Sequence, residues 1–345
     1  MQALQLSREQ RLSIITLPKP QIVNPTDVQI RVAFCAVCGT DLHIIKKHVI
    51  PFEKFEYESR ILGHEFTGIV TAIGETVRSV CIGDRVAIDP NTSCGRCKFC
   101  LRGRPNHCEK YGKMLNRSNG GLAEYVVISE PQVYKLSKDG GLGLAEGVIC
   151  EPMSCIVRGW DIIKSRASSD SRVLINGAGI IGLLWTSMLY MKGFRNITVS
   201  EPSEFRREIT RKLGLNIKVR SPTDSNQWTD RYDLMVDCSG SSKAIEAGLE
   251  RMEYGGAVMM FAVYAKDSQL QLDLSYIQKR ELTVMGSIID PFTYKRSVTL
   301  VEDMYKSNML NFDKLGVKVY SFEDFEAAFK DLDERTISKA VFKIQ

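Results

Sequence analysis

The pattern of apolar and polar positions changes near residue 150 of the chain. After this point, short apolar runs alternate with stretches of helical spacing: NITVS (196–200), EPSEFRREITRKLG (201–214), DLMVDCSG (233–240), SSKAIEAGLERM (241–252), GGAVMMFAVY (255–264) and ELTVMGSII (281–289). Strands that alternate with helices predict a parallel, doubly wound α/β sheet.

The first 150 residues follow a different pattern. They contain short β-like runs between Gly and Asp turns, with few long helical periods: DVQIRVAF (27–34), GIVTAIG (68–74), DRVAI (84–88) and AEYVVI (123–128). This pattern predicts a mostly β domain. The tail, 317–344, returns to strand, amphipathic helix and strand. We therefore expect one domain over 1–152, the α/β domain over 153–290, and a C-terminal segment, 291–345, that completes the first domain.

Composition agrees with a globular protein of two domains. The 345 residues exceed the usual size of a single core, and 44% of them are hydrophobic. The net charge of +5 is spread along the chain without a basic block, so we expect neither a nucleic-acid nor a membrane partner. The N-terminus lacks a secretory pattern, which favours a cytoplasmic location. An apolar run at 173–191 is long enough for a membrane span, but its glycines and β-branched start favour a strand, turn and helix.

Ten cysteines in a reducing compartment are expected to be thiols or metal ligands. Cys94, Cys97, Cys100 and Cys108 have two, two and seven residues between them, a spacing that suits tetrahedral zinc in a lobe of about 90–112. Four thiolates leave no open position on the metal, so this zinc is predicted to be structural. A nucleic-acid-binding zinc module is the alternative, but no aromatic residues interleave the nearby arginines. The other cysteines, except Cys38, are expected to be small core residues.

A second group of possible ligands combines sulfur, nitrogen and oxygen donors. Cys38 lies in CAVCGTDLH, and His64 and Glu65 lie in GHEFTG. Such a mixed set is typical of a zinc ion that keeps an open position for substrate. Glu151, in CEPMSC, is a candidate fourth donor, either directly or through water. An exposed or ion-paired carboxylate is the alternative for Glu151.

A third pattern predicts a dinucleotide site. The apolar run RVLIN leads into GAGIIG, where Gly177, Gly179 and Gly182 surround Ile180 and Ile181 before a helical stretch. Such glycines allow a tight turn and a close approach of pyrophosphate to the helix N-terminus.

The residues after the next apolar run bear on the choice of cofactor. Glu201 lies 19 positions beyond Gly182, where a carboxylate accepts hydrogen bonds from the ribose of NAD and repels the 2′-phosphate of NADP. Arg206 and Arg207 leave NADP open, because arginine pairs with phosphate, although both are also expected as solvated helix charges. We expect NAD.

These motifs follow the order seen in zinc-containing medium-chain dehydrogenases, a family that the chain resembles over nearly its whole length. The resemblance rests on CGTDLH, GHEFTGIVTAIGETV, the four-cysteine spacing, GGLAEYVV, CEPMSC and GAGIIG. It implies a GroES-like catalytic domain and a Rossmann domain. The EPMS segment is similar to sorbitol, arabinitol and other polyol dehydrogenases, and also to threonine dehydrogenase.

The resemblance also implies the chemistry. Two zinc ions are expected in each chain. Cys38, His64 and Glu65 would hold the catalytic one, and Glu151 would bind or orient its water. Thr40 would receive the substrate proton and His43 would pass it to solvent. The expected reaction is NAD-dependent oxidation of a secondary alcohol in a polyol or sugar-derived substrate by a homodimer or homotetramer.

Some questions remain open from the sequence. Threonine-like amino-alcohol oxidation is one alternative function, and a non-catalytic protein that binds dinucleotide or zinc is another. The segment 43–60 departs from the family pattern, and its Phe52, Phe55 and Tyr57 are candidates either for the substrate mouth or for packing under a loop.

Overall fold

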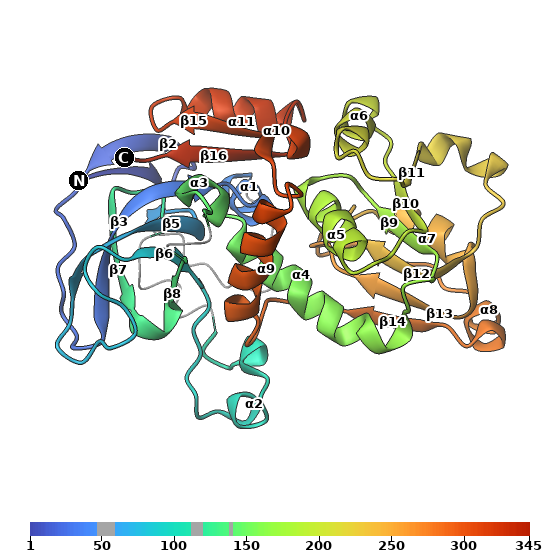
Figure 1. Ribbon diagram of the computed structural model, residues 1–345, viewed down its shortest axis with the longest axis horizontal. Helices are drawn as coiled ribbons and strands as arrows, with labels where there is room; N and C mark the ends of the chain where they lie inside the picture. Colours follow the sequence, from blue (N-terminus) through green and yellow to red (C-terminus); the bar gives the residue numbers. More distant parts are fainter. Residues whose placement is uncertain (47–58, 112–119, 138–140) are drawn as a thin grey trace. The chain divides into compact units, whose positions relative to one another are not determined.

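The computed structural model describes residues 1–46, 59–111, 120–137 and 141–345, and its chain divides into two compact units (Figure 1). The first unit contains Met1–Ser154, Asp290–Leu310 and Val317–Gln345, and the second contains Cys155–Ile289 and Asn311–Gly316. Within the described residues, no helix has the length and apolar character to cross a membrane.

The first unit is built on two β-sheets. A three-stranded sheet has the order β2-β1-β4, and a seven-stranded sheet has the order β15-β16-β3-β5-β6-β8, with β7 paired to β3. The strands are β1 (Gln2–Leu6), β2 (Leu12–Thr16), β3 (Asp27–Ala36), β4 (Arg60–Ile61), β5 (Glu65–Ile73), β6 (Arg85–Ile88), β7 (Tyr125–Ser129), β8 (Val133–Lys135), β15 (Val317–Ser321) and β16 (Lys339–Lys343). The expected mostly β fold is confirmed, and β16 of the tail pairs with β3, more than 300 residues away in sequence.

The described part of the first unit also contains helices and 3-10 turns. They are α1 (Gly39–Ile45), α2 (Lys98–Leu101), α3 (Leu144–Gly147), α9 (Tyr294–Lys306) and α11 (Phe325–Asp333), with 3-10 turns η1 (Pro105–His107) and η3 (Glu130–Gln132). The first turn of α4 (Cys150–Ile163), which includes Glu151, also belongs to this unit. The expected strand, helix and strand of the tail correspond to β15, α11 and β16.

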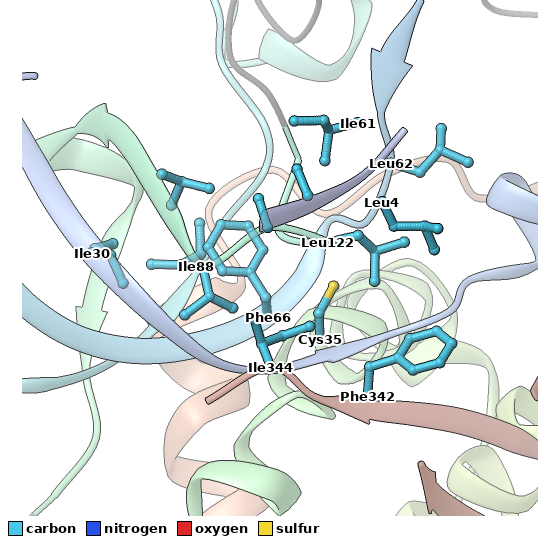
Figure 2. Close-up of a cluster of buried hydrophobic side chains, with 14 of the residues drawn as sticks. Leu4, Ile30, Cys35, Ile61, Leu62, Phe66, Ile88, Leu122, Phe342 and Ile344 are labelled. Carbon is cyan, nitrogen blue, oxygen red and sulfur yellow. The ribbon is translucent and has the colours of Figure 1, made fainter. Parts of the chain in front are cut away.

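Large apolar side chains from distant segments form the core of the first unit (Figure 2). Leu4, Phe66, Leu122 and Phe342 pack in one cluster with Cys35, and all are at most 5% exposed. Burial raises the pKa of the Cys35 thiol well above its usual value. Cys35 is thus a core residue, as expected.

Of the other cysteines expected in the core, Cys150 is buried, Cys155 and Cys238 are only partly buried, and the expectation was wrong for Cys81. Cys81 is exposed, because it lies in the turn before β6, where its backbone N–H donates to the Asp84 side chain. Turn position, rather than side-chain polarity, determines its exposure.

The second unit contains a six-stranded sheet in which every strand pair is parallel, in the order β11-β10-β9-β12-β13-β14. The strands are β9 (Val173–Asn176), β10 (Ile197–Ser200), β11 (Lys218–Arg220), β12 (Tyr232–Asp237), β13 (Met252–Met260) and β14 (Thr283–Gly286). The helices are α5 (Ile180–Met191), α6 (Glu204–Lys212), α7 (Ser242–Leu249), α8 (Leu274–Arg280) and α10 (Phe312–Leu315), with 3-10 turns η4 (Lys164–Arg166) and η5 (Pro222–Gln227). The predicted doubly wound α/β fold is confirmed, and the apolar run 173–191 forms β9, a turn and α5.

Candidate active site

Cys38 lies between the end of β3 and the start of α1, and the helix cap fixes its position. Its backbone N–H donates to Asp41 Oδ2 at 2.9 Å, and its Sγ accepts from the Thr40 N–H at 3.5 Å. This reciprocal arrangement is a capping box with a thiol in place of the usual hydroxyl. The cap therefore orients the sulfur that the sequence predicted as a metal ligand.

Asp41 connects Cys38 to His64. Its side chain is buried, its Oδ1 lies 3.6 Å from His64 Nδ1, and it also accepts from the Gly63 N–H at 3.4 Å. Burial acts to raise the pKa of Asp41, but His64 and the backbone donors lower it overall. A carboxylate at one ring nitrogen orients the other toward a metal. No sequence motif identified Asp41, although its place three residues after a helix cap is a usable signal.

Cys38, His64 and Glu65 form one of two groups of possible metal ligands in the described chain. Their ligand atoms all lie within 4.8 Å of one another. Zinc bonds of about 2.0–2.3 Å require such spacing, and the mixed donors fit an open site. Burial acts to lower the pKa of His64, but Cys38 and Asp41 raise it overall. The spacing and the donor types of the three residues fit a zinc ion. Glu151 is not part of this three-residue group.

Glu151 lies in the first turn of α4 and is buried. Burial, together with the charge of Glu65, raises its pKa to about 7, while His64 and Lys339 act in the opposite direction. Glu151 thus shares the electrostatic environment of the group without lying among its close ligand atoms. The alternative of an exposed Glu151 is excluded.

Lys339 is a charged residue of this site that the sequence motifs did not reveal. Its Nζ lies 2.5 Å from Glu65 Oε2, and both side chains are at most 2% exposed. The same Nζ donates to the Val37 carbonyl at 3.1 Å. Only the pairing of β16 with β3 brings Lys339 here, so no local sequence pattern could have identified it.

Thr40 and His43 lie three residues apart in α1, and both are partly buried. Residues with this spacing lie on the same side of a helix. Phe52, Phe55 and Tyr57 lie outside the described residues.

The second group contains Cys94, Cys97, Cys100 and Cys108, whose sulfur atoms also lie within 4.8 Å of one another. Backbone N–H donors of Cys100 and Glu109 lower the pKa of Cys97 to about 6, which favours the thiolate form that binds metal. Four sulfurs at this spacing fit a closed tetrahedral zinc site.

A partly buried polar network joins the base of this cysteine loop to α4. Asn91 Nδ2 donates to Asp89 Oδ1 at 2.8 Å and also to Asp290, while Tyr111 donates its hydroxyl hydrogen to Asn91 Oδ1. Asp290 accepts from the Ser154 hydroxyl, one turn after Glu151. The two ends of the cysteine loop are thereby connected to the helix that carries Glu151.

The glycine-rich turn has the geometry that its sequence predicted. Gly177 has φ of 94°, in the left-handed region, and follows directly after β9. A Cβ on Gly182 would lie 2.0 Å from the Gly177 carbonyl oxygen. Gly179 caps α5, which begins with Ile180 and Ile181, and a Cβ there would meet open space. The turn therefore leaves the helix N-terminus accessible to a pyrophosphate.

Glu201 follows β10, and the backbone around it fixes its buried carboxylate. Oε2 accepts from the Ala178 N–H at 2.8 Å, and Oε1 accepts from the Ser203 N–H at 2.9 Å. Arg207 donates to the Glu201 carbonyl oxygen at 2.7 Å and pairs with Glu204. Arg206 lies in α6, and its backbone N–H donates to Ser203 Oγ. The carboxylate thus lies beside the glycine-rich turn, as a ribose-binding residue requires.

Comparison with known families matches both parts of the chain. Residues 24–138 match the alcohol dehydrogenase GroES-like domain, and residues 144–344, more than half of the chain, match the glucose dehydrogenase C-terminus. The chain belongs to the zinc-containing medium-chain dehydrogenases. The family resemblance drawn from the motifs is confirmed, and members of this family are NAD(P)-dependent zinc alcohol and polyol dehydrogenases.

Individual relatives of this dehydrogenase span nearly its whole length. It is 28% identical to D-arabinitol dehydrogenase 1 of Uromyces fabae, covering 99% of this chain and 97% of that protein. It is 30% identical to L-threonine 3-dehydrogenase of Pyrococcus abyssi, covering 96% and 94%. The fold matches an alcohol dehydrogenase from Escherichia coli CFT073 complexed with NADH, with a TM-score of 0.86, 21% identity, and coverage of 100% and 99%.

Proposed function

We propose that this dehydrogenase oxidises a secondary alcohol of a polyol or sugar-derived substrate with NAD as the hydride acceptor. The observation that carries this proposal is the group of Cys38, His64 and Glu65, a mixed donor set with room for a further ligand. Similarity to an arabinitol dehydrogenase supports the class of substrate. The family resemblance further supports a homodimer or homotetramer.

Each residue of the site has a distinct task in this proposal. Cys38, His64 and Glu65 hold zinc, Asp41 orients the His64 ring, and Glu151 binds the metal directly or through water. Bound zinc supplies a Lewis acid that lowers the pKa of an alcohol substrate. The Thr40 hydroxyl receives the proton of the substrate hydroxyl, and His43 passes it to solvent.

The second unit positions the cofactor. Gly177, Gly179 and Gly182 let the turn accept the pyrophosphate, and Glu201 accepts hydrogen bonds from the ribose hydroxyls. These residues would hold the dinucleotide, whose nicotinamide would supply the hydride acceptor, while the protein supplies binding and orientation. The fixed carboxylate of Glu201 supports NAD, since it would repel the 2′-phosphate of NADP. Cys94, Cys97, Cys100 and Cys108 hold the structural zinc.

Oxidation of an amino alcohol is the second candidate function. The similarity to L-threonine 3-dehydrogenase, at 30% identity, favours it to a comparable degree.

A substrate panel tests both candidates. Zinc-loaded protein is mixed with polyols, sugar acids, threonine or simple alcohols and with NAD or NADP, and formation of reduced cofactor is followed by absorbance. Turnover of polyols with NAD is the expected result. Preferred oxidation of threonine would establish the second candidate, and no reduction with any compound would contradict both.

A further inference from the structure

Lys339 and Glu65 form a buried ion pair beside the candidate zinc ligands. The distance from Lys339 Nζ to Glu65 Oε2 is 2.5 Å, and the side chains are 2% and 1% exposed. Ammonium and carboxylate groups are rarely buried to this degree unless they are paired. In the metal-free site, each charge therefore compensates the other.

The first unit's main sheet fixes the position of this ammonium group. Lys339 begins β16, which pairs with β3, and Glu65 begins β5 on the other side of β3. The Val37 N–H donates to the Ala340 carbonyl oxygen at 3.0 Å, and the Val37 carbonyl accepts from Lys339 Nζ. Strand pairing fixes the backbones of Lys339 and Glu65, and the Val37 carbonyl holds the Lys339 ammonium group. The ammonium group is therefore expected to stay near Glu65 when a metal binds.

Zinc and Lys339 would therefore share one carboxylate. Glu65 belongs to the group whose ligand atoms lie within 4.8 Å of one another, so a cation held there lies a few ångströms from the ammonium group. Like charges at such a distance repel strongly where water is excluded. The repulsion opposes zinc binding, whereas the attraction between Lys339 and Glu65 stabilises the metal-free site.

We propose that Lys339 is a built-in counter-cation of the metal centre, which holds the Glu65 side chain in place without metal and weakens zinc binding when metal is present. This inference rests on the proposed function of Cys38, His64 and Glu65 as zinc ligands. It assigns Lys339 a positioning and tuning task toward the metal rather than contact with substrate. A purely structural lysine would have a different signature, since its loss would weaken folding and zinc binding together.

The test compares three variants with the wild-type protein. Lys339→Met removes the charge and keeps a similar length, Lys339→Arg keeps the charge, and Lys343→Met removes an equal charge from the exposed end of the same strand. Zinc affinity of the Cys38 site is measured by competition with a chelating dye while the four-cysteine site remains loaded. Melting temperatures are measured with and without metal.

We expect Lys339→Met to bind zinc at this site at least about tenfold more tightly and to melt at a lower temperature without metal. Lys339→Arg and Lys343→Met should stay within about twofold of the wild-type affinity. If Lys339→Met folds only with metal, the rate of zinc transfer to the chelator replaces the equilibrium measurement, and this rate should be slower than in the wild type.

The results can distinguish failure of the proposed Lys339 role from failure of the proposed function. Unchanged or weaker zinc binding in Lys339→Met, with normal binding in the wild type, would overturn the counter-cation and leave the proposed function intact. A wild-type protein whose Cys38 site binds no zinc would overturn both.

Discussion

At the scale of single residues, each of the three clustered zinc ligands contacts one neighbouring group that affects its position or charge. Cys38 Sγ accepts a backbone N–H, His64 faces the Asp41 carboxylate, and Glu65 faces Lys339. Such neighbours orient ligands, and their replacement typically costs 10- to 100-fold in metal affinity or activity. Lys339 differs in our proposal, because it holds Glu65 in place while its positive charge opposes the metal.

At the same scale, we propose that Glu201 gives a preference for NAD over NADP. Glu201→Gln keeps an oxygen that can accept from the Ala178 N–H but removes the charge that repels a 2′-phosphate. We expect NADH to bind about tenfold more weakly and NADPH more tightly than to the wild type. Fluorescence titration with both reduced cofactors measures this change.

Glu208→Gln is the matched control, because it removes an equal charge from the exposed side of α6. Its affinities for both cofactors should equal those of the wild type. A wild-type protein that already prefers NADPH would contradict the assignment of Glu201.

At the scale of elements, local patterns predicted many of the strands and the helices α5, α6, α7 and α11, but neither the other helices nor the contacts between distant elements. The runs 27–34 and 84–88 became β3 and β6, and the spacing of the four cysteines identified their cluster. Alternation and ligand spacing are local properties, so they can be found without a structure. Lys339 reaches Glu65 through the pairing of β16 with β3, and Asp290 reaches Ser154 across 136 residues of sequence, so no local pattern contains either contact.

The polar network at the base of the cysteine loop contains Asp89, whose pKa depends on folding, so the stability of the protein is expected to depend on pH. Burial raises the pKa of Asp89 from 3.8 to about 6, although Asn91 donates to it. Between these pH values the folded protein holds a proton that the unfolded chain has released. The contribution to stability is thus fully present below pH 3.8 and is lost as the pH rises through about 6.

Asp89→Asn should remove this loss of stability at rising pH. The amide oxygen can still accept from Asn91, and there is no charge to bury. Relative to the wild type, the variant should gain about 2 kcal/mol between pH 4 and pH 7. Urea unfolding at several pH values measures the difference, with exposed Asp267→Asn as the control. A pH-independent difference between Asp89→Asn and the wild type would argue against a raised pKa.

At the scale of the whole molecule, the two groups of metal ligands predict different chemistry in one chain. Four thiolates close one site, whereas the three mixed donors leave the other open. Brief chelation should therefore remove about one zinc per chain, together with activity, and leave the second. Metal analysis during chelation checks this expectation. Loss of both ions at one rate, or a single zinc at the start, would speak against two distinct sites.

We propose that the Cys38 site performs the chemistry and that the four-cysteine site stabilises the fold. The most direct measurement is turnover with NAD, alongside melting curves and NAD affinity, for purified Cys38→Ser and Cys100→Ser. Cys38→Ser should keep its fold and bind NAD but lose about 10³-fold or more in turnover, because Lewis-acid stabilisation is worth several kcal/mol. Cys100→Ser should lose stability, while any folded protein stays active. Near-normal turnover by Cys38→Ser, or a stable but inactive Cys100→Ser, would show that the roles of the two metal sites are assigned wrongly.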